Sequence, residues 1–439
     1  MFLIKLINKR LILLGAILLL GIYLRADNLY TWPRLGATFD EYAWTWQGMN
    51  LIQKGVPSSW SPHPQYESFR QVYYQEAHFR IVTPFLEHPP LFGLIAGGFA
   101  LLSGVNDMFS LNIRDIRLLS LILGTLSIGL VFLLVRQLYD EKVALIASFL
   151  YAIIPSIAVG SRIVQNENFF IPAWLLALYL ASKYIKSKNI LYRNFAAVIC
   201  GLLILAKIPW IAAAGSIFLI FLYLKKYKDA LVFIIAPVLG LLVFLSYGIY
   251  YDKDLFFNLW GLQVARYDLT FTSFYAIFQK PYLVDRFYLD GWIYFGWFAF
   301  ILILKDFKKH YLIIFALLSY LVIFISGIPD EPGHGWYRYP FYPFLIISLA
   351  LFIKEHFNKN YVLTFLFFIF IGLTLLENTL TPVFGFSFLV FRGFLIFSSL
   401  SLLPLFFPKT KKIIKYTNYL TLGIIIILSI WSTLLYNEQ

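Results

Sequence analysis

Long apolar runs recur along the whole chain and are separated by short polar breaks. Of the 439 residues, 60% are hydrophobic and only 13% are charged, a balance that a soluble domain does not have. The runs predict an all-α polytopic membrane protein with about 13 transmembrane helices. We expect these spans near residues 11–25, 114–135, 143–160, 169–184, 194–208, 210–224, 230–250, 291–304, 311–327, 339–353, 361–376, 385–405 and 418–435.

Basic residues gather in every second turn between these spans, as in 183–193, 225–228 and 409–415. Cytoplasmic loops collect Lys and Arg, so the N-terminus, with Lys5, Lys9 and Arg10, is predicted to be cytoplasmic. The same distribution explains the formal charge of +13 without a nucleic-acid partner. The first run lacks the small residues that a signal peptidase needs, and we expect it to be retained as an anchor.

Three polar segments then fall on the outer face, at about 26–112, 251–290 and 327–338. The first is the largest and contains two amphipathic stretches, Tyr42–Lys54 and Pro89–Leu102, which we expect to lie along the membrane interface. The inner turns are only a few residues long. We therefore predict a single integral-membrane domain in the plasma membrane, with no separate soluble domain and with its active site on the outer side.

An acidic pair, Asp40 and Glu41, follows the first span directly. Charge at a membrane face is costly to hold, so such a pair is a candidate site. A carboxylate beside an acceptor hydroxyl can act as general base, and we interpret Asp40 and Glu41 as candidate catalytic residues. From spacing alone the alternative is about as good: Asp40 caps a helix that starts at Glu41, and Glu41 favours its dipole.

A second local signal is Glu87-His88-Pro89-Pro90. The prolines suit the first turn of the stretch that follows, and this geometry would aim His88 and Glu87 back toward the acidic pair. We predict His88 at the donor and Glu87 as a supporting acid. A stiff loop entry with a solvent-facing histidine is the alternative.

Arg162 and Glu167 lie in the turn between the third and fourth spans, with Gln165 between them. An arginine beside a carboxylate at a membrane edge can hold a phosphate or help to position a metal, and a structural ion pair is the alternative. Oxygen ligands for a divalent metal are present at Asp40 and Glu167, and also at Asp330 and Glu331 with His334 nearby, and the sequence leaves metal dependence open.

Further cations stand in the later outer segments. Their planar guanidinium groups suit the phosphate of a lipid-linked donor, whereas binding to lipid headgroups is the alternative for each of them. The candidates for binding the phosphate or sugar of the donor in these segments are Arg266, Arg286, Arg338 and Tyr339.

The order of these motifs resembles the protein O-mannosyltransferases, the aminoarabinose transferases and the Rgt-like transferases, which are integral-membrane glycosyltransferases of the GT-C type. The resemblance rests on Phe39-Asp40-Glu41, on His88-Pro89-Pro90-Leu91, on Arg117 with the exit Arg136-Gln137-Leu138-Tyr139, on Ser161-Arg162 after Pro155, and on Arg338-Tyr339-Pro340 opening a late span. It covers most of the chain in order.

This resemblance implies a GT-C fold and an inverting transfer of sugar from a polyprenyl-phosphate donor to a glycan, lipid or protein. It implies that Asp40 is the base, that Glu41 is the neighbouring acid, that His88 is near the donor phosphate and that Glu167 is the acid of the second outer turn. The sequence departs from the mannosyltransferase pattern after Leu91, where Phe92-Gly93 stand in place of Gly-Lys. Mannose and a protein acceptor are therefore less secure than the reaction class.

Two other function classes share parts of this pattern. A lipid-linked glycan polymerase or ligase would have the same topology, but its largest outer loop is expected later in the chain. A flippase or transporter would be expected to carry charges in mid-span and an internal repeat, and neither is evident in the sequence. The absence of a GxxxxGK[ST] motif gives no support to ATP-driven transport.

Overall fold

The computed structural model describes residues 2–34, 38–265, 277–278, 284, 290–327, 335–376 and 381–437. Each of the predicted spans coincides with helix, which confirms the helical membrane fold. The helices of the first half are α1 (Phe2–Ala26), α4 (Ile113–Leu138), α5 (Glu141–Ile153), α6 (Pro155–Gly160), α7 (Asn166–Ser187), α8 (Ile190–Ile204), α9 (Ile211–Tyr223) and α10 (Tyr227–Ala265). Those of the second half are α12 (Gly291–Ile303), α13 (Phe307–Gly327), α14 (Tyr342–Glu355), α15 (Tyr361–Leu375), α16 (Thr381–Phe384), α17 (Phe388–Ser399), α18 (Leu403–Phe406) and α19 (Lys411–Leu434).

Not every predicted span is one continuous helix. Within the described residues, 7 helical stretches are long and apolar enough to cross a membrane, and several shorter apolar helices accompany them. The predicted span 143–160 is divided because Pro155 cannot continue α5; it occupies the first turn of α6 instead. The predicted span 385–405 is divided in the same way between α17 and α18, with Pro404 in the first turn of α18.

The first outer segment contains the two predicted amphipathic helices, α2 (Asp40–Lys54) and α3 (Leu91–Leu102). Their backbones touch at glycines. A Cβ added to Gly48 would lie 1.8 Å from the carbonyl oxygen of Gly93, and one added to Gly97 would lie 2.3 Å from the backbone nitrogen of Met49. The two helices therefore pack as one unit, with no room for a larger residue at their crossing.

Between these helices the chain forms a three-stranded antiparallel sheet that the sequence analysis did not predict. It has the order β1 (Ser59–Trp60), β3 (Ala77–Val82), β2 (Arg70–Tyr74), and Phe79 of β3 pairs with Val72 of β2. Phe79 is fully buried, with its ring 5.1 Å from that of Trp46 in α2. The sheet is thus held against α2 by aromatic packing.

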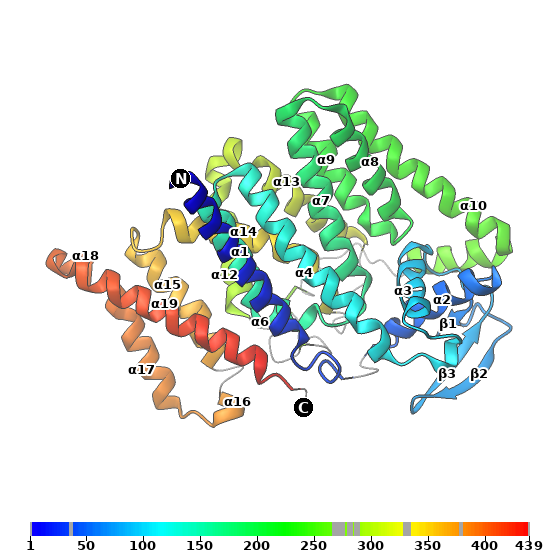
Figure 1. Cartoon of the computed structure of the whole chain (residues 1–439), viewed down its shortest axis with the longest axis horizontal. Helices are drawn as coiled ribbons and strands as arrows, with labels where there is room; N and C mark the ends of the chain where they lie inside the picture. Colours follow the sequence, from blue (N-terminus) through cyan, green and yellow to red (C-terminus); the bar gives the residue numbers. More distant parts are fainter. Residues whose placement is uncertain are drawn as a thin grey trace.

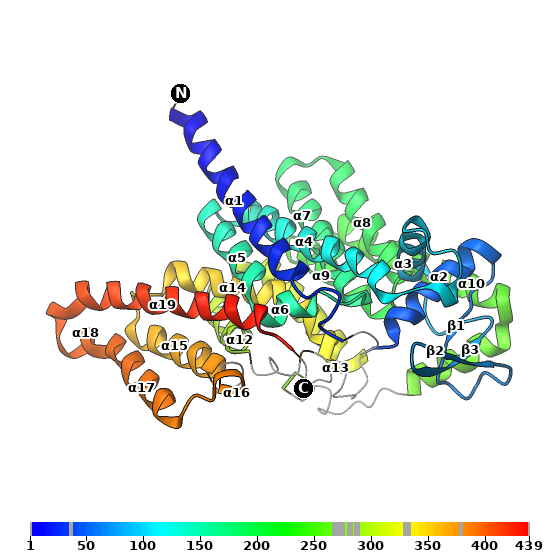
Figure 2. The same cartoon turned by 60° about the horizontal axis from the view of Figure 1, so that its bottom comes forward.

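The elements divide into three regions (Figure 1). The sheet, α2 and α3 lie at one end, α15 to α19 lie at the other, and most of the remaining helices lie between them. Figure 2, turned by 60°, shows the same division. The central region carries the short turns on which the candidate site is built: the turn between α6 and α7, the turn between α8 and α9, and the 3-10 helix η5 (Gly335–Phe341) before α14.

Candidate active site

Asp40 is the first residue of α2, and its carboxylate is directed at the turn before α7. Its Oδ2 accepts a hydrogen bond from Nε2 of Gln165 at 3.1 Å, and the side chain is half-buried. Phe39 occupies the N-cap position, and the backbone N–H of Asp40 donates to Oγ1 of Thr38 at 3.2 Å. The capping alternative is therefore wrong, because the Asp40 carboxylate is held by a distant side chain and caps no helix.

Glu41 points in another direction, toward Arg117, and is fully buried. Its carboxylate accepts hydrogen bonds from Nη2 and Nε of Arg117, at 3.0 and 3.3 Å, and from the backbone N–H of Val164 at 3.0 Å. Arg117 also donates to the carbonyl oxygens of Leu29 and Pro33. Glu41 thus joins three segments of the core, and we do not retain it as a catalytic group.

The turn between α6 and α7 brings Glu167 to a lysine from the next turn. Oε1 of the fully buried Glu167 lies 2.8 Å from Nζ of Lys207, which stands between α8 and the 3-10 helix η2 (Ile208–Trp210). Oε2 of Glu167 is buried and has no hydrogen-bond partner among the described residues. This carboxylate therefore has an acceptor position left for a hydroxyl group of a ligand.

Lys207 was not among the candidate site residues predicted from the sequence. Its Nζ lies 4.5 Å from the ring centroid of Tyr337 in η5 and 5.4 Å from that of Trp210. Burial opposes its charge, but Glu167, Tyr337 and the nearby Asp40 outweigh burial and raise the pKa of Lys207. A signal was available: Lys207 is a lysine at a turn that the predicted topology places outside, whereas basic residues were expected to gather in inner turns.

His88 joins this group through a tryptophan. Its ring lies 4.7 Å from that of Trp44, whose Nε1 is 3.4 Å from Oε1 of Gln165. Glu87 points elsewhere, with its Oε2 3.4 Å from Nε2 of His63 in the same outer segment. Two side chains, Trp44 and Gln165, therefore link His88 to Asp40. Glu87 instead contacts His63, a residue of its own polar segment.

Arg162 is fully buried in the core, away from a ligand site. Its Nη2 donates to the carbonyl oxygen of Leu24 at 2.7 Å, and its Nη1 to that of Trp32 at 3.3 Å. These contacts bind the end of α1 to the turn before α7. The N–H donors of Arg162 that we expected to bind a phosphate are thus bonded to carbonyl oxygens of the chain.

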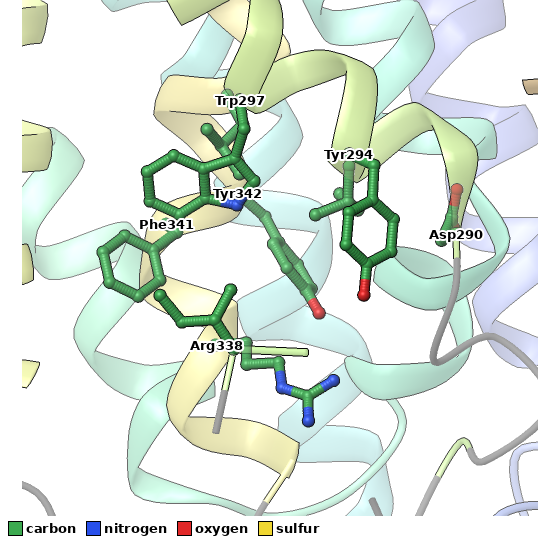
Figure 3. A pocket seen from close by; sticks show the side chains of 9 residues that line it. Asp290, Tyr294, Trp297, Arg338, Phe341 and Tyr342 are labelled. Carbon is green, nitrogen blue, oxygen red and sulfur yellow. The ribbon is translucent and has the colours of Figure 1, made fainter. Parts of the chain in front are cut away.

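Arg338 and Tyr339 lie in η5, which opens α14 as predicted. Arg338 is buried and lines a pocket with Asp290, Tyr294, Trp297 and Tyr342 (Figure 3). Tyr339 packs against α6, because a Cβ added at Gly160 would lie 2.6 Å from its Cζ. These two residues are therefore separate from the contacts of Lys207.

Several predicted residues lie outside the described part of the chain: Arg266, Arg286, Asp330, Glu331 and His334. Among the described residues, no group of three His, Cys, Asp or Glu side chains is placed to hold a metal ion. Asp40 is bonded to an amide and Glu167 to an ammonium group, so this pair of carboxylates does not fit a divalent-metal site.

An apolar groove begins beside Lys207. It is bordered by Ile204, Ile208 and Ile211 on one side and by α10 on the other, where Phe233, Pro237 and Leu241 line it. The groove contains about 620 Å³ of empty space, its opening included. Ile208, the neighbour of Lys207 in the sequence, thus belongs to an apolar groove of a size that suits a lipid chain.

Residues 87–250 match the model of a family described as dolichyl-phosphate-mannose-protein mannosyltransferase. The matched part contains His88, Arg117, Glu167 and Lys207 but not Asp40. The comparison with curated proteins gives no match.

Three solved structures share the fold. ArnT from Cupriavidus metallidurans bound to undecaprenyl phosphate has 14% identity and a TM-score of 0.55, over 96% of this chain and 77% of ArnT. Its apo state gives 14% and 0.53, over 97% and 78%. The oligosaccharyltransferase AglB from Archaeoglobus fulgidus, in complex with an inhibitory peptide and a dolichol-phosphate, gives 15% and 0.50, over 94% of this chain and 56% of AglB.

The family match and the shared fold agree with the resemblance that the order of motifs had indicated. They do not name the sugar or the acceptor. They show that this chain shares its fold with ArnT and AglB and that residues 87–250 carry the matched family region.

Proposed function

We propose that this protein transfers a sugar from a polyprenyl-phosphate donor to an acceptor hydroxyl, with Asp40 as general base. The observation that carries the proposal is the meeting of Asp40, Gln165, Glu167 and Lys207, from three separate turns, in one group of polar side chains. ArnT was solved with bound undecaprenyl phosphate and AglB in complex with a dolichol-phosphate, which supports the same class of donor here.

In this reaction the acceptor hydroxyl gives its proton to Asp40 as its oxygen bonds to the anomeric carbon of the donor. The bond from that carbon to the phosphate oxygen breaks on the opposite face, and its electron pair stays with the phosphate. Attack from the opposite face inverts the anomeric centre. Gln165 fixes the orientation of the carboxylate through its bond to Oδ2.

Lys207 is the described cation best placed for the leaving phosphate. One of its three N–H donors is taken by Glu167, and the ammonium lies over the Tyr337 ring. The isoprenoid tail would occupy the groove that starts at Ile208, beside the same lysine. Neutralising the charge that develops on the phosphate lowers the barrier to transfer.

Replacing Asp40 with Asn tests the base directly. We expect a loss of at least about 100-fold in transfer from a radiolabelled polyprenyl-phosphate sugar, because an amide cannot take the proton. Asp254→Asn, at an exposed aspartate of α10, is the matched control and should transfer normally. Turnover by Asp40→Asn at the rate of the unsubstituted protein would remove Asp40 from the mechanism.

We further propose that the site faces the outer side of the plasma membrane, with the N-terminus inside. The support is the basic character of the turns at 183–193 and 225–228, which is typical of cytoplasmic loops. Cys200 is buried, so a Cys200→Ser background gives a chain for single-cysteine labelling. In intact cells an impermeant maleimide should label Arg70→Cys and spare Lys228→Cys, and the reverse result would invert the topology.

A further inference from the structure

Seven basic residues and a single acid lie where α7 ends, α8 begins and α9 turns into α10. This basic cluster consists of Lys183, Lys186, Lys188, Arg193, Lys225, Lys226, Lys228 and Asp229. The helix α7 starts at Asn166 beside the candidate active site and has 22 residues, so the cluster lies about 30 Å from that site. The cluster therefore takes no part in the transfer chemistry.

The acid of the cluster already has its partners. Oδ1 of Asp229 lies 2.7 Å from Nη1 of Arg193, and Oδ2 accepts a hydrogen bond from the hydroxyl group of Tyr184 at 2.9 Å. In the part of the chain that the structure describes, no carboxylate forms an ion pair with Lys188 or Lys226. The positive charge of these two lysines is thus left without a matching anion.

Lys188 and Lys226 are held together although both are cations. Nζ of Lys226 lies 5.0 Å from the ring centroid of Tyr184, on which the guanidinium of Arg193 also lies, at 5.9 Å. The side chains of Lys188 and Lys226 contact each other across the two turns. Burial lowers the pKa of Lys226, and its contact with Lys188 lowers this pKa further. Because an ammonium group only donates, an anion that accepts from both lysines would relieve their repulsion.

The backbone at Lys188 is in a conformation that favours glycine. Lys188 ends α7 with φ 60°, and its N–H donates to the carbonyl oxygen of Tyr184 at 2.9 Å. Lys225, at the facing turn, has φ 58°. Glycine takes this left-handed conformation at lower cost than any other residue. A lysine kept at such a position indicates that its charge has a use.

Exposed apolar side chains begin within about one turn of these lysines. Leu191 and Phe195 of α8 are 56% and 59% exposed, and Tyr227 and Leu231 of α10 are 63% and 52% exposed. A soluble phosphate would not contact this surface, whereas the chains of a lipid would cover it. The combination of an unmatched cation pair with adjoining apolar surface therefore suits an amphiphile with an anionic head.

We propose that the basic cluster binds the phosphate of an anionic phospholipid, with Lys188 and Lys226 as its donors. The lipid chains lie along α8 and α10, against Phe195 and Leu231. The bound lipid joins the turn after α7 to the turn before α10 and so stabilises the folded protein. The leaflet follows from the proposed topology and is the inner one, but binding itself does not depend on that topology.

Native mass spectrometry of the full-length protein in detergent, titrated with dioleoyl phosphatidylglycerol, tests this site. We expect Lys188→Gln/Lys226→Gln to raise the Kd about tenfold, since charged hydrogen bonds to the phosphate are lost. Lys305→Gln/Lys308→Gln is the matched control, because it removes two exposed lysines from the turn between α12 and α13, and it should leave the Kd unchanged. Phosphatidylcholine, which has no net charge, should bind about tenfold more weakly than phosphatidylglycerol.

Thermal unfolding separates binding from folding. Lys188→Gly removes both the charge and the left-handed lysine, so without lipid it should unfold at the temperature of the unsubstituted protein or above it. Phosphatidylglycerol should raise the unfolding temperature of the unsubstituted protein more than that of Lys188→Gly.

An unchanged Kd in Lys188→Gln/Lys226→Gln would remove the cluster as a lipid site. An equal rise of the Kd in both double variants would also overturn the proposal, because it would show a general attraction to positive charge. Displacement of the lipid by equimolar glycerol 3-phosphate would assign the cluster to a soluble phosphate instead. None of these measurements uses a sugar donor, so a protein unable to transfer sugar would leave the lipid site standing.

Discussion

Two ion pairs whose carboxylates are fully buried in the described part of the chain are built differently. In the pair of Glu41 and Arg117 both side chains are fully buried, and three N–H groups bind the carboxylate. In the pair of Glu167 and Lys207 the lysine side chain keeps 13% of its surface exposed, and one carboxylate oxygen has no partner among the described residues. The first pair is saturated, whereas the second has capacity left for a ligand.

The contrast shows how two acidic residues that are adjacent in the sequence come to have different roles. Asp40 and Glu41 are neighbours in the first turn of α2, where successive side chains point in directions about 100° apart. Glu41 is therefore turned into the core toward Arg117, and Asp40 is turned toward Gln165 at the candidate site. A position next to a candidate base is no evidence of a shared role.

The largest expected effect comes from breaking the saturated pair. Arg117→Met leaves the carboxylate of Glu41 buried without its cation, and we expect a loss of about 3–5 kcal/mol in the free energy of unfolding. Denaturation in detergent measures it. The double variant Arg117→Met/Glu41→Gln should recover part of this loss. Full stability of the single variant would show that the pair is not structural.

A third buried carboxylate, Asp290, sharpens the comparison because it accepts hydrogen bonds from backbone N–H groups and burial dominates its titration. Burial raises its pKa to about 6 from the ordinary 3.8. The folded state therefore binds this proton more tightly than the unfolded state, so the contribution of Asp290 to stability falls as the pH rises from about 4 to about 6, by roughly 3 kcal/mol.

Asp290→Asn should remove that pH dependence. Unfolding midpoints measured from pH 4 to 7 should move in favour of the variant as the pH rises, whatever the constant offset from the altered contact with Ser156. A difference between the two proteins that does not change with pH would contradict the raised pKa.

The next prediction concerns the crossing of α2 with α3, because α2 carries both Asp40 and Glu41. Gly48→Ala drives a Cβ into the backbone of Gly93, and we expect a loss of about 1–3 kcal/mol in the free energy of unfolding. Gly98→Ala is the matched control, because its Cβ would meet Ile52 at an ordinary 3.7 Å. Equal stability of the two variants would show that the crossing of α2 and α3 tolerates displacement.

The smallest effect tests the open pair. Lys207→Met combined with Glu167→Gln leaves neither charge unpaired, so the protein should fold normally. We expect its Kd for undecaprenyl phosphate to rise about tenfold, since one charged hydrogen bond to the phosphate is lost. Unchanged affinity would show that the phosphate does not bind at Lys207. The pair of Glu167 and Lys207 would then be structural, like that of Glu41 and Arg117.

Much of the fold was predictable because the helices follow directly from the apolar runs. The sheet was not predicted, since β3 is only six residues long and its inward residues, Phe79 and Ile81, are too few to stand out. The breaks at Pro155 and Pro404 were readable in principle, but hydropathy averaged over a window does not see a single proline.

The site was predictable only in part. Asp40 and Glu167 of the candidate site were singled out in the sequence because polar residues at the ends of apolar spans are conspicuous. Their partners were not, because Glu41 meets Arg117 and Glu167 meets Lys207 only through the packing of helices far apart in the sequence. Arg162 shows the same limit. It lies in the turn that we expected to hold a ligand, but its guanidinium is bonded to the carbonyl oxygens of Leu24 and Trp32.

The glycine crossing of α2 and α3 has a mechanical consequence. Because the two helices touch through their backbones, α2 cannot tilt without carrying α3 and the His88 segment with it. Asp40, the proposed general base, then stands on a rigid pair of helices. We expect any adjustment to substrates of different size to come from the turns facing this helix pair, and sequence changes that alter selectivity to accumulate in those turns.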